Sequence, residues 1–113
     1  MERLSLATAG AERAEPLLVD VSIAPLTKPL GAGAPFQAAI FRIAPGGRVV
    51  RHPATVPQLL AVIEGRGVVS GADGVEEPIV AGEAVVWAEG EEHETRSDEG
   101  LVALVLEGHG LLS

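Results

Sequence analysis

Three histidines are the main candidates for chemistry in this chain of 113 residues, which contains no cysteine. They are His52, His93 and His109. None belongs to a His-x-His or His-x-x-x-His pair, so no metal motif lies within one local segment. Neutral imidazole suits Fe, Ni, Zn and Cu as a ligand. Any site that the histidines share must therefore be assembled by the fold.

Other polar residues near the histidines allow two interpretations. Gln58 begins an apolar run, where its amide needs hydrogen-bond partners or a ligand. Four acidic residues surround His93, namely Glu89, Glu91, Glu92 and Glu94. They would attract a cation, supply a general base or raise the pKa of His93, but charge runs are usually solvated turns, which we favour.

The remaining candidates are a histidine near the C-terminus, the arginines and one tryptophan. His109 lies between two glycines, so we expect an exposed tail outside the site. Three arginines are candidate receptors for an anionic substrate, namely Arg42, Arg51 and Arg66. Strand alternation turns Arg51 away from His52. Trp87 would either line a pocket or fill the core.

Short apolar runs separated by Gly and Pro must position these residues. This pattern is typical of an all-β sandwich or barrel. The runs are Leu17–Ile23, Phe36–Ile43, Arg48–His52, Gln58–Ile63, Gly67–Ser70, Val75–Val80, Ala84–Trp87, His93–Ser97 and Leu101–Leu106. Turns are expected at residues 45–47, at 64–67 around Gly65, and at 71–74, where a hairpin loop is predicted.

Alternation along the strands predicts which side chains share a face with the candidates. It places Arg48 and Val50 beside His52, and Leu60 and Val62 beside Gln58. We therefore expect an apolar lumen lined by Val50, Leu60 and Val62. Both faces of the run Gln58–Ile63 are apolar, which predicts a central strand covered on both sides.

Two glycine-framed motifs resemble those of the cupin family. The first family motif is G-x(5)-H-x-H-x(3,4)-E-x(6)-G, and here Gly46, His52 and Gly65 occupy its positions. Ala54 replaces the second His and Gln58 replaces the Glu. The second motif is G-x(5)-P-x-G-x(2)-H-x(3)-N. Its matching residues are Gly82, Gly90 and His93, with Ala88 for the Pro and Ser97 for the Asn.

The resemblance covers about Phe36 to Leu106 and implies a fold. We expect an all-β cupin-type double-stranded β-helix, or jelly-roll barrel, with an N-terminal arm or strand. Residues 1–113 would form a single cupin domain. Within it, residues 1–16 would form the arm and residues 36–106 the core barrel.

The resemblance also implies a site in the barrel lumen. Carried over by position, His52, Gln58 and His93 would hold a divalent transition metal (Fe, Ni, Zn or Mn), and Ala54 would contribute nothing. Three protein ligands leave open coordination positions, as catalysis needs. Loss of the family carboxylate would lower the affinity. The alternative is a polar cluster whose members hydrogen-bond to one another or to water.

Composition excludes several partners. The formal net charge is −8 and hydrophobic residues make up 47%. Such a surface repels nucleic-acid backbones and anionic membranes. No secretory signal or membrane-spanning run is found in the sequence, so a cytoplasmic protein is the default expectation.

Three functions remain open. One is a metal-dependent enzyme of the oxygenase type, and the second is a module that binds a small molecule in the lumen without turnover. The third is a structural homodimer without a ligand. A homodimer is expected in each case, with contacts from the N-terminal arm, Val19, Val21 and Ile23.

Overall fold

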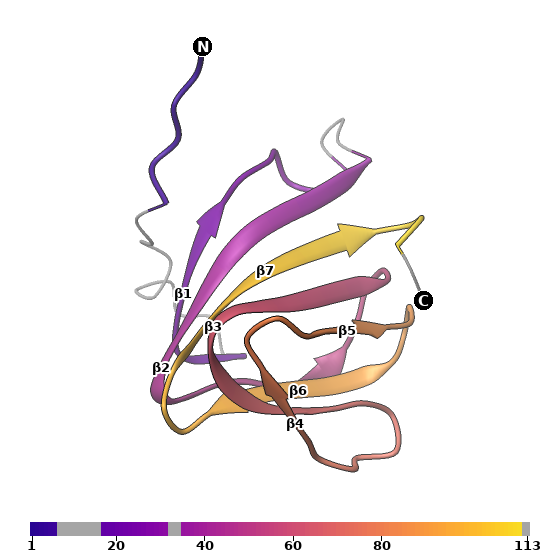
Figure 1. Ribbon diagram of the computed structural model, residues 1–113. Helices are drawn as coiled ribbons and strands as arrows, with labels where there is room; N and C mark the ends of the chain where they lie inside the picture. Colours follow the sequence, from indigo (N-terminus) through magenta and orange to yellow (C-terminus); the bar gives the residue numbers. More distant parts are fainter. Residues whose placement is uncertain (7–16, 32–34, 112–113) are drawn as a thin grey trace.

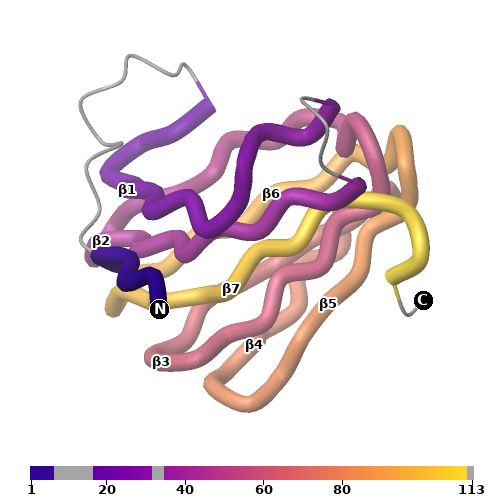
Figure 2. Tube along the Cα trace, turned by 90° about the horizontal axis from the view of Figure 1, so that it is seen from above, coloured from indigo at the N-terminus to yellow at the C-terminus, as the bar shows by residue number. Residues whose placement is uncertain are grey.

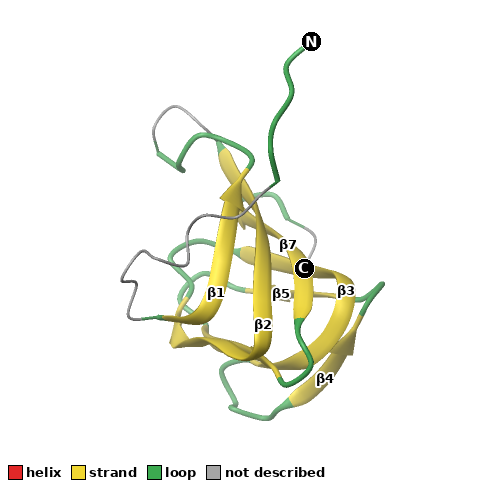
Figure 3. Ribbon diagram, turned by 90° about the vertical axis from the view of Figure 1, so that its left-hand side faces the viewer, coloured by secondary structure: helices red, strands yellow, loops and turns green. Residues whose placement is uncertain are grey.

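A computed structural model describes residues 1–6, 17–31 and 35–111, which contain seven β-strands and no helix (Figures 1 and 3). The strands are β1 Leu18–Pro25, β2 Phe36–Pro53, β3 Gln58–Ser70, β4 Glu77–Val80, β5 Ala84–Trp87, β6 Glu92–Ser97 and β7 Leu101–Gly108. The described residues therefore supply no apolar helix long enough to cross a membrane.

Two long strands, β2 and β3, close the sheet into a barrel. The first half of β2 pairs with β7 and its second half with β6, while β1 pairs with β2 on both sides of Gly46. The first half of β3 pairs with β7 and β5, and its second half pairs with β6 and β4. All pairs are antiparallel, and β7 lies between β2 and β3 (Figure 2). The predicted all-β jelly-roll barrel is confirmed.

The barrel interior is apolar along most of its length. Val21 of β1, Leu60 of β3 and Ala103 of β7 are almost completely buried, at 1%, 3% and 0% exposure. They belong to one cluster of buried side chains from six of the seven strands, in which β5 contributes Trp87 and most other members are valine, leucine or isoleucine. Burial of this surface stabilises the fold by roughly 25 cal/mol per Å².

Two predicted turns lie inside strands. Gly46 and Gly65 adopt positive φ angles of 85° and 79°, yet β2 and β3 continue through them. A glycine in this conformation bends a strand sharply, and the neighbouring strands keep pairing with it on both sides of the bend. The predicted hairpin loop at residues 71–74 is confirmed, because Gly74 N–H donates to the Gly71 carbonyl at 3.0 Å and β3 pairs with β4.

The predicted alternation is wrong at Val50. In the pairing of β2 with β6, Val49 lies opposite Thr95 and His52 opposite His93, so the register shifts between them. This β-bulge reverses the alternation, and Val49 lines the lumen in place of Val50. Leu60 lines the lumen as predicted, whereas Val62 is packed in the apolar cluster.

The outer face of β3 is less covered than the sequence predicts. The strand is central, since it pairs with β7 on one side and with β5 and then β4 on the other. Leu59 and Ala61 are only half-buried, however, and Ile63 is 52% exposed. The prediction that both faces are covered is therefore wrong within a single chain.

The proposed homodimer contacts are corrected in part. Val21 is buried in the core and Ile23 lines the lumen, so neither is available to a partner, whereas Val19 is 39% exposed. Residues 1–6 of the predicted arm are exposed and contain no strand, and Arg42 donates a hydrogen bond to the Leu6 carbonyl at 2.7 Å. Residues 7–16 of the arm lie outside the described residues. The homodimer itself stays a prediction.

Substitution of Gly65 by valine should destabilise the barrel strongly. The positive φ costs a side chain about 1–2 kcal/mol. An added Cβ would also meet the Gly100 carbonyl oxygen and come within 3.0 Å of Leu101 Cα. We expect Gly65→Val to lower the free energy of unfolding by at least about 3 kcal/mol, measured by urea denaturation.

Gly74→Val is the matched control. Gly74 also has a positive φ, of 73°, but an added Cβ would meet no atom within 4 Å. This variant should lose only the conformational cost of about 1–2 kcal/mol. Equal losses in the two variants would show that the close approach of β3 to Gly100 is not a constraint.

Candidate functional site

The three predicted site residues line one cavity of about 330 Å³ in the barrel lumen. Residues from β1, β2, β3, β6 and β7 border it, and most of this lining is apolar. The polar side chains among them are His52, Thr55, Gln58, His93, Thr95 and Glu107. The structure thus brings together polar side chains that lie far apart in the chain, from His52 to Glu107.

Strand pairing places these polar groups in two facing pairs. His52 lies near the end of β2 and pairs with His93 on β6. Gln58, the first residue of β3, pairs with Glu107 on β7. Directly opposed residues of an antiparallel pair project to the same face of the sheet. Two imidazoles and an amide–carboxylate pair therefore face the lumen from neighbouring strands.

Backbone carbonyls fix the orientation of both imidazoles. Nδ1 of His52 lies 2.7 Å from the Val50 carbonyl oxygen, and Nδ1 of His93 lies 3.1 Å from that of Glu91. A carbonyl oxygen only accepts hydrogen bonds, so each Nδ1 donates and carries the hydrogen. In the neutral form of each ring, Nε2 then holds the lone pair, and no hydrogen bond from a described residue to either Nε2 is found.

The two rings lie close enough to serve one ligand. Their centroids are 4.5 Å apart and their planes are inclined by 50°. The described residues contain no group of three His, Cys, Asp or Glu placed to hold a metal ion. The available donor set is therefore the neutral one of two imidazole nitrogens and the Gln58 amide oxygen.

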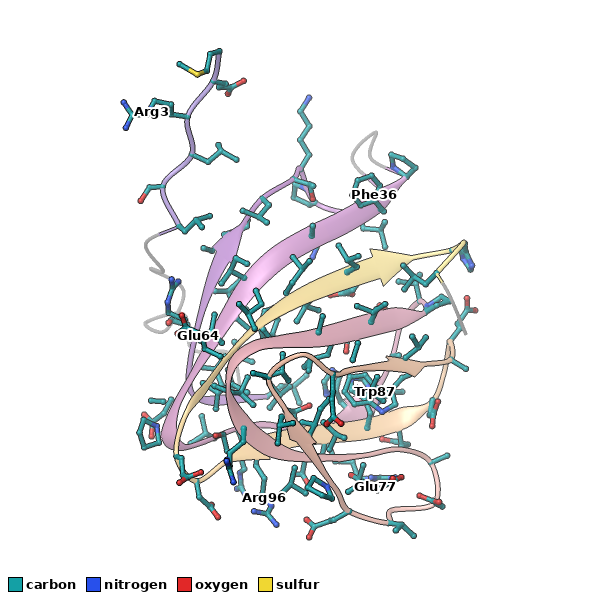
Figure 4. The ribbon with its side chains drawn as sticks, viewed as in Figure 1. Arg3, Phe36, Glu64, Glu77, Trp87 and Arg96 are labelled. Atoms are coloured by element: carbon teal, nitrogen blue, oxygen red, sulfur yellow. The ribbon has the colours of Figure 1, made fainter. Side chains whose placement is uncertain are left out.

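Burial favours the uncharged form of His93. The residue is 2% exposed, and its ring stacks on Trp87 at a centroid distance of 4.4 Å. Figure 4 shows Trp87 within the barrel. Burial is the largest influence on the pKa of His93 and lowers it, and repulsion from His52 in its protonated form acts in the same direction. The Glu91 carbonyl and the nearby Glu91 and Glu92 charges oppose this shift without reversing it.

Glu89 and Glu91 lie in the turn before β6, as the plainer interpretation predicted, whereas Glu92 and Glu94 lie on β6 itself. The Glu91 carboxylate accepts hydrogen bonds from the Ala88 N–H at 2.9 Å and the Ala72 N–H at 3.1 Å. Glu89 lies 3.6 Å from the exposed His109 imidazole. This contact places His109 at the surface, outside the lumen lining.

Glu107 is the site residue that sequence reasoning missed. It lies half-buried on β7 and lines the cavity. The buried face of β7 runs through Leu101, Ala103 and Val105, so strict alternation places Glu107 on it. Alternation along this strand was thus visible in the sequence, but both family motifs end before β7 begins.

Comparisons with known proteins agree with this architecture. The family model described as "Cupin domain" matches residues 39–109. Comparison with curated proteins gave no match. A cupin-like protein from Thermotoga maritima superposes with a TM-score of 0.76 at 18% identity, covering 96% of this chain and 79% of that one.

Two further solved structures are similar. A cupin-2 domain from Rhodospirillum rubrum has a TM-score of 0.73 at 19% identity, covering 91% of this chain and 70% of that one. A protein described as a predicted oxalate decarboxylase, from Thermotoga maritima, has a TM-score of 0.68 at 23% identity, covering 76% of this chain and 77% of that one. These likenesses establish the fold.

His93 should make the stability of the metal-free protein depend on pH. Its folded pKa lies below the ordinary value of 6.5, so the unfolded chain binds the proton more readily. The stabilisation is complete above about pH 6.5 and is lost as pH falls toward the folded pKa. We expect urea denaturation with chelator to show a loss of at most about 1.4 kcal/mol per pH unit from this residue.

The pH effect of His93 is isolated by comparison with two variants. His93→Gln should flatten the profile between pH 7 and 5, whereas His109→Gln should keep the wild-type slope because His109 is exposed. All three proteins contain the same carboxylates. Parallel profiles for wild type and His93→Gln would show that the buried imidazole is not responsible.

Proposed function

This chain belongs to the cupin domain family, and we propose that His52, Gln58 and His93 hold a divalent transition ion in its lumen. The candidate ions are Fe, Ni, Zn and Mn. Such an ion would polarise a substrate oxygen or bind O₂ when present. The apolar cavity beside the three ligands would receive a small organic molecule. We propose an oxygenase-type enzyme as the activity that uses such a site.

One observation carries the proposal. Both histidines donate Nδ1–H to backbone carbonyls, at 2.7 and 3.1 Å, which leaves both Nε2 lone pairs for the lumen. Metal-ligating histidines almost always donate their other ring nitrogen in this way, because the hydrogen bond fixes the tautomer and the ring orientation. The facing rings, 4.5 Å apart, support a shared ligand.

A second candidate is a module that binds a small molecule without metal or turnover. The neutral donor set favours it, because no carboxylate of the set offsets the charge of a divalent ion. Thermal-shift measurements with a metabolite panel separate the two candidates. Stabilisation that survives chelation supports the module, and stabilisation that needs the metal supports the enzyme.

Metal binding should depend on both histidines and respond to restoration of the carboxylate. In calorimetric titrations with Ni²⁺ and Zn²⁺, His52→Ala and His93→Ala should abolish binding, because each removes one of only three ligands. Gln58→Glu should tighten binding on the order of tenfold, because it adds an anionic oxygen beside the ion. Quenching of Trp87 fluorescence by Ni²⁺ gives an independent readout, since Trp87 is the only tryptophan and stacks on His93.

His109→Ala is the control, because His109 is exposed and lies outside the cavity. It should retain wild-type affinity. Urea denaturation establishes that each alanine variant is folded, since His93→Ala removes a buried ring. Substoichiometric metal in the wild-type protein after supplying Fe²⁺, Ni²⁺ and Zn²⁺ would eliminate the metal proposal.

A further inference from the structure

Among the described residues that line the lumen, one side chain is a carboxylate and none is a lysine or an arginine. Glu107 reaches the cavity from β7, opposite Gln58 on β3 and Gln37 on β2. No described lysine or arginine forms an ion pair with its carboxylate, whereas Arg66 and Arg96 are each paired with surface acids. The Glu107 carboxylate therefore lines the cavity and is able to accept hydrogen bonds from a ligand there.

The arginines that sequence analysis considered as anion receptors are engaged elsewhere. Arg51 donates to the Gly71 carbonyl at 2.8 Å and thereby holds the β3–β4 loop. Arg42 donates to the Leu6 carbonyl, and Arg66 lies 3.2 Å from Glu99 at the surface. None of the three lines the cavity. The predicted anion-receptor role is thus not supported by where these side chains lie.

This charge distribution decides which ligand groups are favourable. A carboxylate brought beside Glu107 would place two like charges in a mostly apolar space, with no lysine or arginine in the described lining to offset them. An alcohol or amine would instead donate a hydrogen bond to the Glu107 carboxylate, and charge-assisted bonds of this kind are the stronger class. The Gln58 amide, which both donates and accepts, complements such a group.

We propose that the lumen selects a small, largely apolar molecule bearing a hydrogen-bond-donating alcohol or amine, that Glu107 receives this donor, and that carboxylate ligands are disfavoured. The inference rests on the proposed binding of a small molecule in the same cavity. A volume of about 330 Å³ suits a ligand of about one ring, since ligand pockets begin near 300 Å³.

Three probes of one size test the selection: benzylamine, benzyl alcohol and benzoate. Affinities are measured by ¹H–¹⁵N NMR titration of chelator-treated protein, so that the lumen charge comes only from side chains of this chain. We expect benzylamine and benzyl alcohol to bind at least about tenfold more tightly than benzoate. Benzyl alcohol separates hydrogen bonding from attraction to the overall charge of −8.

Two variants assign the effect to Glu107. In Glu107→Gln, the amine-to-benzoate affinity ratio should fall at least about tenfold, because the side chain keeps its size and loses its charge. Glu77→Gln is the matched control. Glu77 is exposed on β4, outside the lumen lining (Figure 4), so the wild-type ratio should be kept.

Benzoate binding as tightly as the other two probes, or an unchanged ratio in Glu107→Gln, would overturn the inference while leaving small-molecule binding intact. Failure of all three probes to bind would contradict the proposed small-molecule site and this inference together. Thermal unfolding establishes that Glu107→Gln is folded. If Glu107→Gln is unfolded, the amine-to-benzoate affinity ratio of the wild-type protein alone decides whether carboxylate ligands are disfavoured.

Discussion

The β-bulge in β2 between Val49 and His52 is the constraint on which the lumen site depends. Val49 opposes Thr95 and His52 opposes His93, so three steps along β2 match two along β6. Regular alternation from the lumen-facing Val49 would turn His52 outward. The bulge brings His52 back to the interior, where the Val50 carbonyl lies 2.7 Å from its Nδ1. The bulge thus places the His52 side chain on the interior face of β2 and places its Nδ1 beside a carbonyl oxygen, which favours the Nδ1–H tautomer.

Burial and charge placement then define what the lumen is able to bind. His93 is held by the Glu91 carbonyl and by stacking on Trp87, and its burial lowers its pKa and so favours the neutral ring. Arg51, which precedes His52 in the chain, does not line the cavity but donates a hydrogen bond to the Gly71 carbonyl of the β3–β4 loop. The cavity is therefore apolar, with neutral nitrogen and amide donors and a single carboxylate at Glu107.

Glycine spacing and apolar runs predicted an all-β sandwich or barrel, because turn chemistry and alternation are local. The meeting of His52, Gln58 and His93 was implied only by the resemblance to the cupin motifs. Three features depended on tertiary pairing and were not predictable in that way. Strands β2 and β3 continue through Gly46 and Gly65 because neighbouring strands hold both halves. Val49 replaces Val50 in the lumen because of the bulge, and Ile23 faces the lumen because β1 pairs with β2. Glu107 was predictable by alternation but lies beyond both motifs.

The central claim is that both lumen histidines are Nδ1–H tautomers whose Nε2 lone pairs face the cavity. Long-range ¹H–¹⁵N NMR spectra of metal-free protein at pH 7.5 measure this directly, with His52→Gln and His93→Gln assigning the signals. The account predicts a protonated Nδ1 and an unprotonated Nε2 for each residue. A protonated Nε2 on either ring would contradict it, because that ring would have no lone pair to offer a ligand in the lumen.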